Sequence, residues 1–252
     1  MSVKSLGEPI ALGYTAEVYS WNEEYVLKLF HEWFPPDRAR YEARIARVVQ
    51  NAGLPVPAVG EMIEVDGRLG LIYERVVGPS MLDVLTAKPW LFLHLARRLA
   101  ELQTQMHDIE GVGELPSQHD KLREKIQAAP MLSSGLRKAV LDALDKLTEE
   151  SRLCHGDFHP GNILMTGKGT VVIDWIDVSR GNPVGDIARS SLLIEAGVPP
   201  EGTPMKRLID LLRGWLHDAY LRRAAQLFHW DSDEFVTWNT PSRLCVSESF
   251  AA

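Results

Sequence analysis

Three side chains with hard oxygen atoms lie close together in the sequence, and their types suit a divalent cation. Asp157 and Asn162 lie five positions apart in the glycine- and proline-containing segment CHGDFHPGNIL, and Asp174 directly follows the β-branched run VVI. A carboxylate at the end of a buried strand is costly unless it is paired or coordinates a metal. Carboxylate and amide oxygens suit Mg²⁺ better than zinc. The sequence therefore predicts a magnesium site.

The order and spacing of these residues, with two more upstream, match the motifs of kinases. The step from Asp157 to Asn162 is that of the catalytic loop H-R-D-x-x-x-x-N, and Asp174 takes the place of the aspartate of D-F-G. Lys28 in the run YVLKLF resembles the lysine of a V-A-I-K strand, and Glu42 on the next predicted helix is its natural partner. Each motif alone is weak, but together they favour phosphoryl transfer.

Several longer segments resemble the aminoglycoside phosphotransferase and choline kinase-like family. They are LPVP (54–57), IYERV (72–76), HGDFHPGNIL (155–164), IDW (173–175) and GNPVGDIA (181–188). The resemblance runs from Leu12 to Ala188, with a looser match to the C-terminal helices. It implies an α+β, bilobal, protein-kinase-like fold. The small β-rich N-lobe would comprise residues 1–77, and the larger, mostly helical C-lobe residues 78–252.

The resemblance also implies a reaction, the transfer of the γ-phosphoryl group of ATP to a hydroxyl group of a small molecule. ATP would bind in the cleft between the lobes, and GTP is the alternative nucleotide. Asp157 would be the catalytic residue that accepts or aligns the hydroxyl proton. Asn162 and Asp174 would hold Mg²⁺ against the phosphates, and Lys28, oriented by Glu42, would contact the phosphates from the other side.

Further nucleotide contacts follow from the resemblance. Glu74 and Val76 would form backbone hydrogen bonds with the base at the hinge. Gly13 is the one clear glycine of the nucleotide loop LGYTAEVY, which departs from the glycine-rich pattern of kinases. The ten positions from Val18 to Lys28 imply a tight hairpin after this loop.

The acceptor that the resemblance implies is a small hydroxylated molecule, favoured to be cationic, such as an aminoglycoside, and the role is antibiotic resistance or metabolism. Near the C-terminus, Asp231, Asp233 and Glu234 lie beside Trp230, where carboxylates could pair with ammonium groups and the ring could contact a sugar. Asp177 is a second acceptor-side candidate. A solvated acidic turn explains the acidic run equally well. Choline, homoserine and sugar-type metabolites are alternative acceptors.

Other interpretations of the same residues are weaker. The segment GDFH also matches a metallophosphoesterase block, but that class needs further histidine motifs and leaves the upstream lysine and glutamate unexplained. Cys154, His155 and His159 lack a fourth ligand for a zinc site. We interpret His155 as a structural residue that holds the loop, His159 as structural or near the site, and Asp186 as a carboxylate that braces the loop through backbone N–H groups. A non-catalytic nucleotide-binding pseudokinase is disfavoured because every catalytic position is filled.

Hydrophobic periodicity predicts the elements that must position these residues. Strands are expected over residues 16–21, 25–30, 61–65 and 68–77, and helices over residues 38–50, 91–107, 120–128, 135–150 and 207–228. Leu95, Leu99, Leu102 and Met106 form an apolar stripe that faces a core, and Trp215 is expected to be core as well.

Composition is that of an ordinary globular protein of 252 residues, with 45% hydrophobic residues and a net charge of −7. This excludes a disordered or fibrous chain. The acidic balance argues against a nucleic-acid partner and agrees with a cationic acceptor. No apolar run is long enough for a signal peptide or a membrane span, and two cysteines suit a reducing compartment. We therefore expect a cytoplasmic protein without a membrane or an obligate protein partner.

Overall fold

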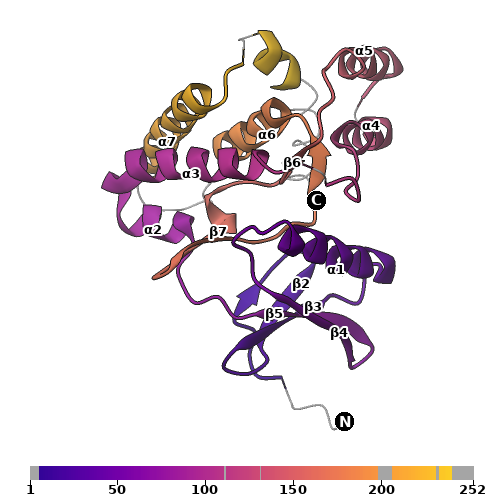
Figure 1. Cartoon of the computed structure of the whole chain (residues 1–252), viewed down its shortest axis with the longest axis vertical. Helices are drawn as coiled ribbons and strands as arrows, with labels where there is room; N and C mark the ends of the chain where they lie inside the picture. The colour runs from indigo at the N-terminus through magenta and orange to yellow at the C-terminus, as the bar shows by residue number, and fades with distance from the viewer. Residues whose placement is uncertain (1–5, 111, 131, 198–205, 231–232, 240–252) are drawn as a thin grey trace. The chain divides into compact units, whose positions relative to one another are not determined.

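The computed structural model describes residues 6–110, 112–130, 132–197, 206–230 and 233–239. The chain divides into two compact units (Figure 1). The first unit comprises Met1–Pro79 and Leu164–Ile176, and the second comprises Ser80–Ile163 and Asp177–Ala252. The predicted division after residue 77 did not foresee that residues 164–176 join the first unit.

Two backbone hydrogen bonds connect this later segment to the first unit. The Met165 N–H donates to the Pro79 carbonyl and the Val172 N–H donates to the Pro55 carbonyl, each at 2.9 Å. The segment contains strand β8 (Gly169–Val172) and most of its partner β7 (Ile163–Thr166). Asp174, which follows β8, therefore belongs structurally to the first unit although it lies far along the sequence.

The first unit is built on a five-stranded antiparallel sheet with the strand order β1-β2-β3-β5-β4. The strands are β1 (Ala11–Leu12), β2 (Ala16–Ser20), β3 (Tyr25–Phe30), β4 (Val59–Val65) and β5 (Arg68–Glu74). Val18 on β2 pairs with Lys28 on β3, so the tight hairpin predicted from their spacing is confirmed. The Asn22 side chain forms its turn by accepting the backbone N–H groups of Glu24 and Tyr25.

The alternation of side chains along β3 determines what faces helix α1 (Pro36–Asn51). Phe30 packs in a cluster with Ala43 of α1, whereas Leu27 packs in a separate cluster. Because successive side chains of a strand point to opposite faces, Lys28 lies on the same face as Phe30. The helix and the lysine are therefore placed together by the strand pattern.

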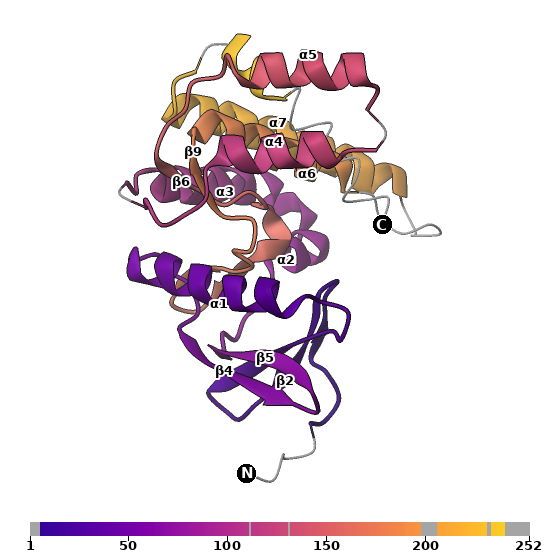
Figure 2. The ribbon, with the colours of Figure 1, turned by 90° about the vertical axis from the view of Figure 1, so that its right-hand side faces the viewer.

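The second unit is mostly helical. Its helices are α2 (Met81–Ala87), α3 (Phe92–His107), α4 (Gln118–Ala128), α5 (Ser134–Leu144), α6 (Pro183–Ala196) and α7 (Lys206–Leu227), and residues 233–239 are also helical. Helices α3 and α7 pack side by side, as do α4 and α5 (Figures 1 and 2). In the described part of the chain, no helix combines the length and the apolar character that crossing a membrane requires.

The apolar stripe on α3 is buried as predicted, and Leu95 and Leu99 have almost no exposed surface. The prediction for Trp215 is wrong, because this side chain is 46% exposed. Its ring contacts Phe92, with 5.7 Å between the ring centroids, and Phe92 is the first residue of α3. Because Phe92 lies at the end of α3, Trp215 lies at the edge of the helix pair. The neighbouring Tyr220 is the buried aromatic residue of α7.

Candidate active site

In the first unit, the predicted phosphate-binding lysine is held between two carboxylates. Lys28 Nζ lies 2.7 Å from Glu42 Oε1 and 3.5 Å from Asp174 Oδ1. Burial acts to lower the pKa of Lys28, but Asp174 and Glu42 together raise it above its ordinary value. The ammonium group is therefore charged at neutral pH, and the buried Glu42 carboxylate has the counter-charge that its burial requires.

Tyr73 is a member of this cluster that the sequence reasoning missed. Its hydroxyl group donates to Glu42 Oε1 at 3.3 Å. Burial, followed by the charges of Glu42 and Asp174, raises the pKa of Tyr73 well above its ordinary value, so the hydroxyl group remains a donor. Val26, two positions before Lys28, pairs with Tyr73 across the sheet, which places tyrosine and lysine on one face. Only the strand register reveals this relation.

Asp174 has a left-handed backbone conformation, with φ at 64°. Aspartate tolerates this region better than most residues because its short polar side chain can form local hydrogen bonds. Its side chain is 43% exposed. One carboxylate oxygen lies near Lys28, and the group is open to a ligand.

The other nucleotide-side predictions fall between β1 and β2 and at the end of β5. Gly13 lies between β1 and β2, and its N–H donates to the Ala16 carbonyl at 2.9 Å. The N–H of Glu74 donates to the Ala58 carbonyl at 2.8 Å. The amide of Glu74 is therefore engaged, which leaves the Glu74 carbonyl and the backbone of Val76 as groups that could contact a base.

In the second unit, Asp157 and Asn162 contact each other within the predicted catalytic loop. Asn162 Nδ2 donates to the Asp157 carbonyl at 2.9 Å and to Asp157 Oδ2 at 3.1 Å. The amide nitrogen of Asn162 is thus engaged, and its Oδ1 is the atom suited to a metal. Asn162 Oδ1 and, in the first unit, the Asp174 carboxylate are both oxygen donors, and oxygen donors are the groups that suit Mg²⁺.

Two histidines shape the same loop. The Gly161 N–H donates to His159 Nδ1 at 3.1 Å, so the ring proton belongs on Nε2, which lies 3.7 Å from Asp157 Oδ2. The Asp157 N–H donates to His155 Nδ1 at 3.2 Å, which confirms His155 as a residue that holds the loop. Burial acts to raise the pKa of Asp157, but His159 and then His155 lower it below its ordinary value. Asp157 is therefore ionised.

Asp186 braces the loop as predicted. Its carboxylate accepts the backbone N–H groups of His155 at 3.2 Å and Gly156 at 2.8 Å. It also accepts hydrogen bonds from two side chains of helix α3, Gln103 Nε2 at 2.9 Å and His107 Nε2 at 3.0 Å. The side chain is completely buried, so these donors replace the water that it loses on folding.

The α3 partners of Asp186 were missed by the sequence reasoning. Gln103 and His107 lie four positions apart on one helical face and are buried among apolar residues. The Tyr220 hydroxyl group of α7 donates to Gln103 Oε1, and Gln103 Nε2 also donates to Ser190 Oγ. Polar residues at apolar positions of a helix were the available signal, since such groups need partners when they are buried.

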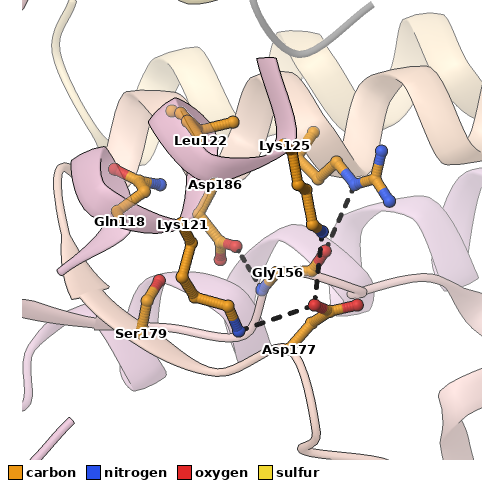
Figure 3. A pocket seen from close by; sticks show the side chains of 10 residues that line it. Gln118, Lys121, Leu122, Lys125, Gly156, Asp177, Ser179 and Asp186 are labelled. Carbon is orange, nitrogen blue, oxygen red and sulfur yellow. Dashed lines mark hydrogen bonds and ion pairs between the residues drawn. The ribbon is translucent and has the colours of Figure 1, made fainter. Parts of the chain in front are cut away.

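Asp177 lies against the catalytic loop. Gly156 has φ at +79°, and a Cβ atom there would lie 2.4 Å from the Asp177 carbonyl oxygen, so only glycine allows this approach. Asp177 Oδ1 lies 3.5 Å from Lys121 Nζ and 3.3 Å from Lys125 Nζ (Figure 3). This predicted acceptor-side carboxylate is therefore already paired with two cations.

The other predicted acceptor residues lie after α7, on a different segment from Asp177. The Trp230 ring stacks on Phe235 with 5.7 Å between centroids, and it packs against a core cluster that contains Trp238. Asp233 is exposed and Glu234 is half-buried. Asp231 lies outside the described residues.

The sheet with its paired lysine, the helical unit with its aspartate–asparagine loop, and the aspartate after the hairpin together define a kinase-like protein. The sequence profile of the phosphotransferase enzyme family (APH) matches residues 7–227. The chain belongs to this family, which confirms the resemblance stated from the motifs. The predicted class, a phosphotransferase with an alcohol group as acceptor, is likewise confirmed. No curated protein matches the chain.

Solved structures confirm the α+β kinase-like fold class. A complex of amicoumacin kinase hAmiN with AMP-PNP, Ca²⁺ and Ami has a TM-score of 0.61 at 15% identity, over 94% of this chain and 78% of the other. An aminoglycoside-3′-phosphotransferase of type VIII has a TM-score of 0.60 at 18% identity, over 94% and 91%. APH(3″)-Id from Streptomyces rimosus with ADP and streptomycin has a TM-score of 0.60 at 17% identity, over 94% and 92%.

Proposed function

We propose that the protein is an ATP- and Mg²⁺-dependent kinase that phosphorylates a hydroxyl group of a small molecule. The observation that carries the proposal is the charged Lys28, held between Glu42 and Asp174. A buried lysine with this pairing is what a kinase uses to contact nucleotide phosphates. Similar solved structures contain AMP-PNP with Ca²⁺ in one case and ADP in another, which supports a nucleotide and a divalent cation as ligands.

The proposed reaction assigns a role to each unit. The acceptor hydroxyl oxygen forms a bond with the γ-phosphorus while the bond to the β,γ-bridging oxygen breaks, and ADP leaves. The hydroxyl proton passes to the ionised Asp157 carboxylate, which Asn162 orients through its amide. Mg²⁺, when bound by Asn162 and Asp174, would supply positive charge against the phosphates. Lys28 would contribute further positive charge.

The base of the nucleotide is assigned to the end of β5. The Glu74 carbonyl and the backbone of Val76 would recognise it, and the turn at Gly13 would lie over the phosphates. ATP is the proposed nucleotide, and comparing its Km with that of GTP tests the alternative. The predicted cationic acceptor, and the choline, homoserine or sugar-type alternatives, remain predictions that a panel of acceptors tests.

ATP with Mg²⁺ is expected to raise the melting temperature of the wild-type protein, and Lys28→Ala is expected to lose most of that shift. The alanine lacks the ammonium group that pairs with the phosphates, and binding stabilises the native state by mass action. Differential scanning fluorimetry at several ATP concentrations measures the effect. Lys138→Gln, an exposed lysine on α5, is the matched control. A wild-type protein that ATP does not stabilise contradicts the proposal.

Glu42→Gln is expected to weaken ATP binding about fivefold while leaving the fold intact. The amide keeps a hydrogen bond to Lys28 but loses the charge, and a charge-assisted bond is stronger than a neutral one by about 1 kcal/mol. Asp174 is then the remaining charged partner of Lys28 among the described residues. The attraction to Asp174 would move the lysine ammonium group away from the phosphates. Isothermal titration calorimetry measures the Kd, with the exposed Glu64→Gln as control. An unchanged Kd would show that Glu42 does not position the lysine.

A further inference from the structure

A small pocket in the second unit adjoins the catalytic loop and is lined by cationic side chains (Figure 3). Its lining includes Lys121, Lys125, Gly156, Asp177, Asp186 and Arg189. Its volume is about 50 Å³, which is room for a few water molecules. The pocket therefore suits one small charged or polar group of a larger ligand, and it begins one residue before Asp157.

The ionised groups of this pocket have a positive sum. Lys121 and Lys125 lie one turn apart on α4, and both side chains extend to Asp177 (Figure 3). Asp186 also lines the pocket, but its carboxylate is engaged by four donors, including the backbone of the catalytic loop. With Arg189 included, three cations thus face two carboxylates, Asp177 and the internally hydrogen-bonded Asp186, and the sum is one positive charge.

Arg189 supplies an independent observation. Its Nε donates to the Gly156 carbonyl at 3.3 Å. Its Nη1 is buried and has no hydrogen-bond partner among the described residues. A buried guanidinium nitrogen is costly without an acceptor, and carboxylate and phosphate oxygens are the acceptors that guanidinium groups bind best. An anionic group in the pocket would supply the hydrogen-bond acceptor that Arg189 Nη1 lacks among the described residues.

The two lysines can also serve such a group. The Lys125 side chain is 40% exposed, so its ammonium group can move from Asp177 to a ligand. Lys121 would then remain as the ion-pair partner of Asp177. Burial acts to raise the pKa of Asp177, but Lys125, Lys121 and Arg189 lower it below its ordinary value. Asp177 is therefore ionised and needs one lysine, and the remaining charge is available for an anion.

We propose that this pocket binds an anionic group of the acceptor, a carboxylate or a phosphate ester, and so presents the acceptor hydroxyl group to Asp157. The inference rests on the proposed kinase function and names its substrate class as an anionic hydroxylated small molecule. It opposes the cationic acceptor predicted from the acidic composition, because the charge beside the catalytic loop differs in sign from the net charge of the chain.

A matched panel of acceptors tests the substrate class. Each carbon skeleton is offered as a carboxylic acid, a phosphate ester, a neutral alcohol and an amine; gluconate, glucitol 6-phosphate, glucitol and glucamine form one such set. ADP release is expected with kcat/KM at least about tenfold higher for the acid or the phosphate ester, and the better of the two identifies the anion. Stimulation confined to neutral or cationic members, or by no anionic member, overturns the inference.

Two variants with opposite expected signs make the test specific. Lys125→Gln is expected to raise the KM of the acceptor about tenfold without changing the KM of ATP, whereas Lys138→Gln on α5 changes neither. Asp177→Asn is expected to lower the KM of an anionic acceptor, because it removes the negative charge that pairs with both lysines. A site for a cationic group predicts the reverse. Unchanged acceptor KM values in both variants, or a higher KM in Asp177→Asn, overturn the inference.

Failure of the inference and failure of the kinase function give different results. ATP hydrolysis without acceptor, abolished by Asp174→Ala, reports on the nucleotide machinery alone. If hydrolysis is present and no anionic acceptor is preferred, only the anion site is wrong. If hydrolysis and nucleotide binding are both absent, the kinase function itself is wrong. A rise in the KM of ATP in Lys125→Gln would assign the pocket to the nucleotide and overturn the inference.

Discussion

Replacing Asp157 by Asn is expected to lower the turnover of phosphoryl transfer about a thousandfold while nucleotide binding is retained. The asparagine cannot accept the hydroxyl proton, and a positioned general base contributes about 10²–10⁴ to the rate. Its amide oxygen can still accept from Asn162 Nδ2, so the loop contact seen in the wild type is preserved. Coupled ADP-release kinetics measure turnover, and fluorimetry with ATP and Mg²⁺ measures binding.

Comparison with Asp157→Ala separates the chemical role from the structural one. Alanine removes the proton acceptor and also the partner of Asn162, so it should impair metal-dependent steps as well as proton transfer. Asp142→Asn, an exposed carboxylate on α5, is the control. Wild-type turnover in Asp157→Asn would show that the carboxylate is not the base. Release of inorganic phosphate from a phosphorylated acceptor would instead favour the metallophosphoesterase.

The nucleotide side of the site was predictable because short sequence patterns determine it. The position of Lys28 follows from a strand pattern, Glu42 from the next helix, and the contact of Asp157 with Asn162 from their spacing. Tyr73 was not predictable in this way. Its contact with Glu42 depends on the register of β3 against β5, which is a property of the assembled sheet.

The pocket beside the catalytic loop was not predictable, for a physical reason. Lys121 and Lys125 are charges on a short amphipathic helix, and such residues are usually solvated. They become a pocket lining only because α4 packs against the segment that carries Asp177. The same limit explains why Asp177 was assigned to a cationic acceptor: sequence reveals a carboxylate but not its partners.

The predicted ends of helices and strands were wrong where the local sequence favours a helix or strand beyond the residues that pack into the core. The predicted helix over 135–150 ends at Leu144, and the turn that follows it places Leu147 in the same core cluster as Leu144. The hairpin with β8 joins the first unit through hydrogen bonds to Pro55 and Pro79, and both bonds are long-range contacts. The hydrophobic periodicity of one segment contains no information about where its helix stops packing or about hydrogen bonds to distant segments.

Asp186→Asn is expected to lower the free energy of unfolding by about 3–5 kcal/mol, because it leaves buried donors without a charged acceptor. An asparagine offers one oxygen where the carboxylate oxygens now accept four donors, and its NH₂ group would face an N–H of Gly156 or His107. Urea unfolding followed by circular dichroism measures the change. Asp145→Asn, whose carboxylate is 53% exposed and paired with Arg123, is the matched control and should change stability by less than about 1 kcal/mol.

The same residue should make stability depend on pH, with a definite sign. Burial acts to raise the pKa of Asp186, but His107, Gln103 and the Gly156 amide lower it below its ordinary value. The native state then binds fewer protons than the unfolded state, whose Asp pKa is about 3.9, so this contribution is complete above that value and is lost as pH falls. Asp186→Asn should therefore show a flatter decline in unfolding free energy from pH 5 to 3 than the wild type. Parallel declines would show that other carboxylates cause the acid sensitivity.

Amide hydrogen exchange distinguishes a local brace from a general contribution to the core. If Asp186 mainly holds the catalytic loop, its replacement should accelerate exchange at His155 and Gly156, whose N–H groups it accepts, more than exchange in the centre of α3. Turnover should then fall further than nucleotide affinity, because the loop carries Asp157 and the nucleotide lysine lies in the first unit. Equal acceleration at all amides would instead mean that Asp186 stabilises the whole second unit and that the loss of activity follows from unfolding.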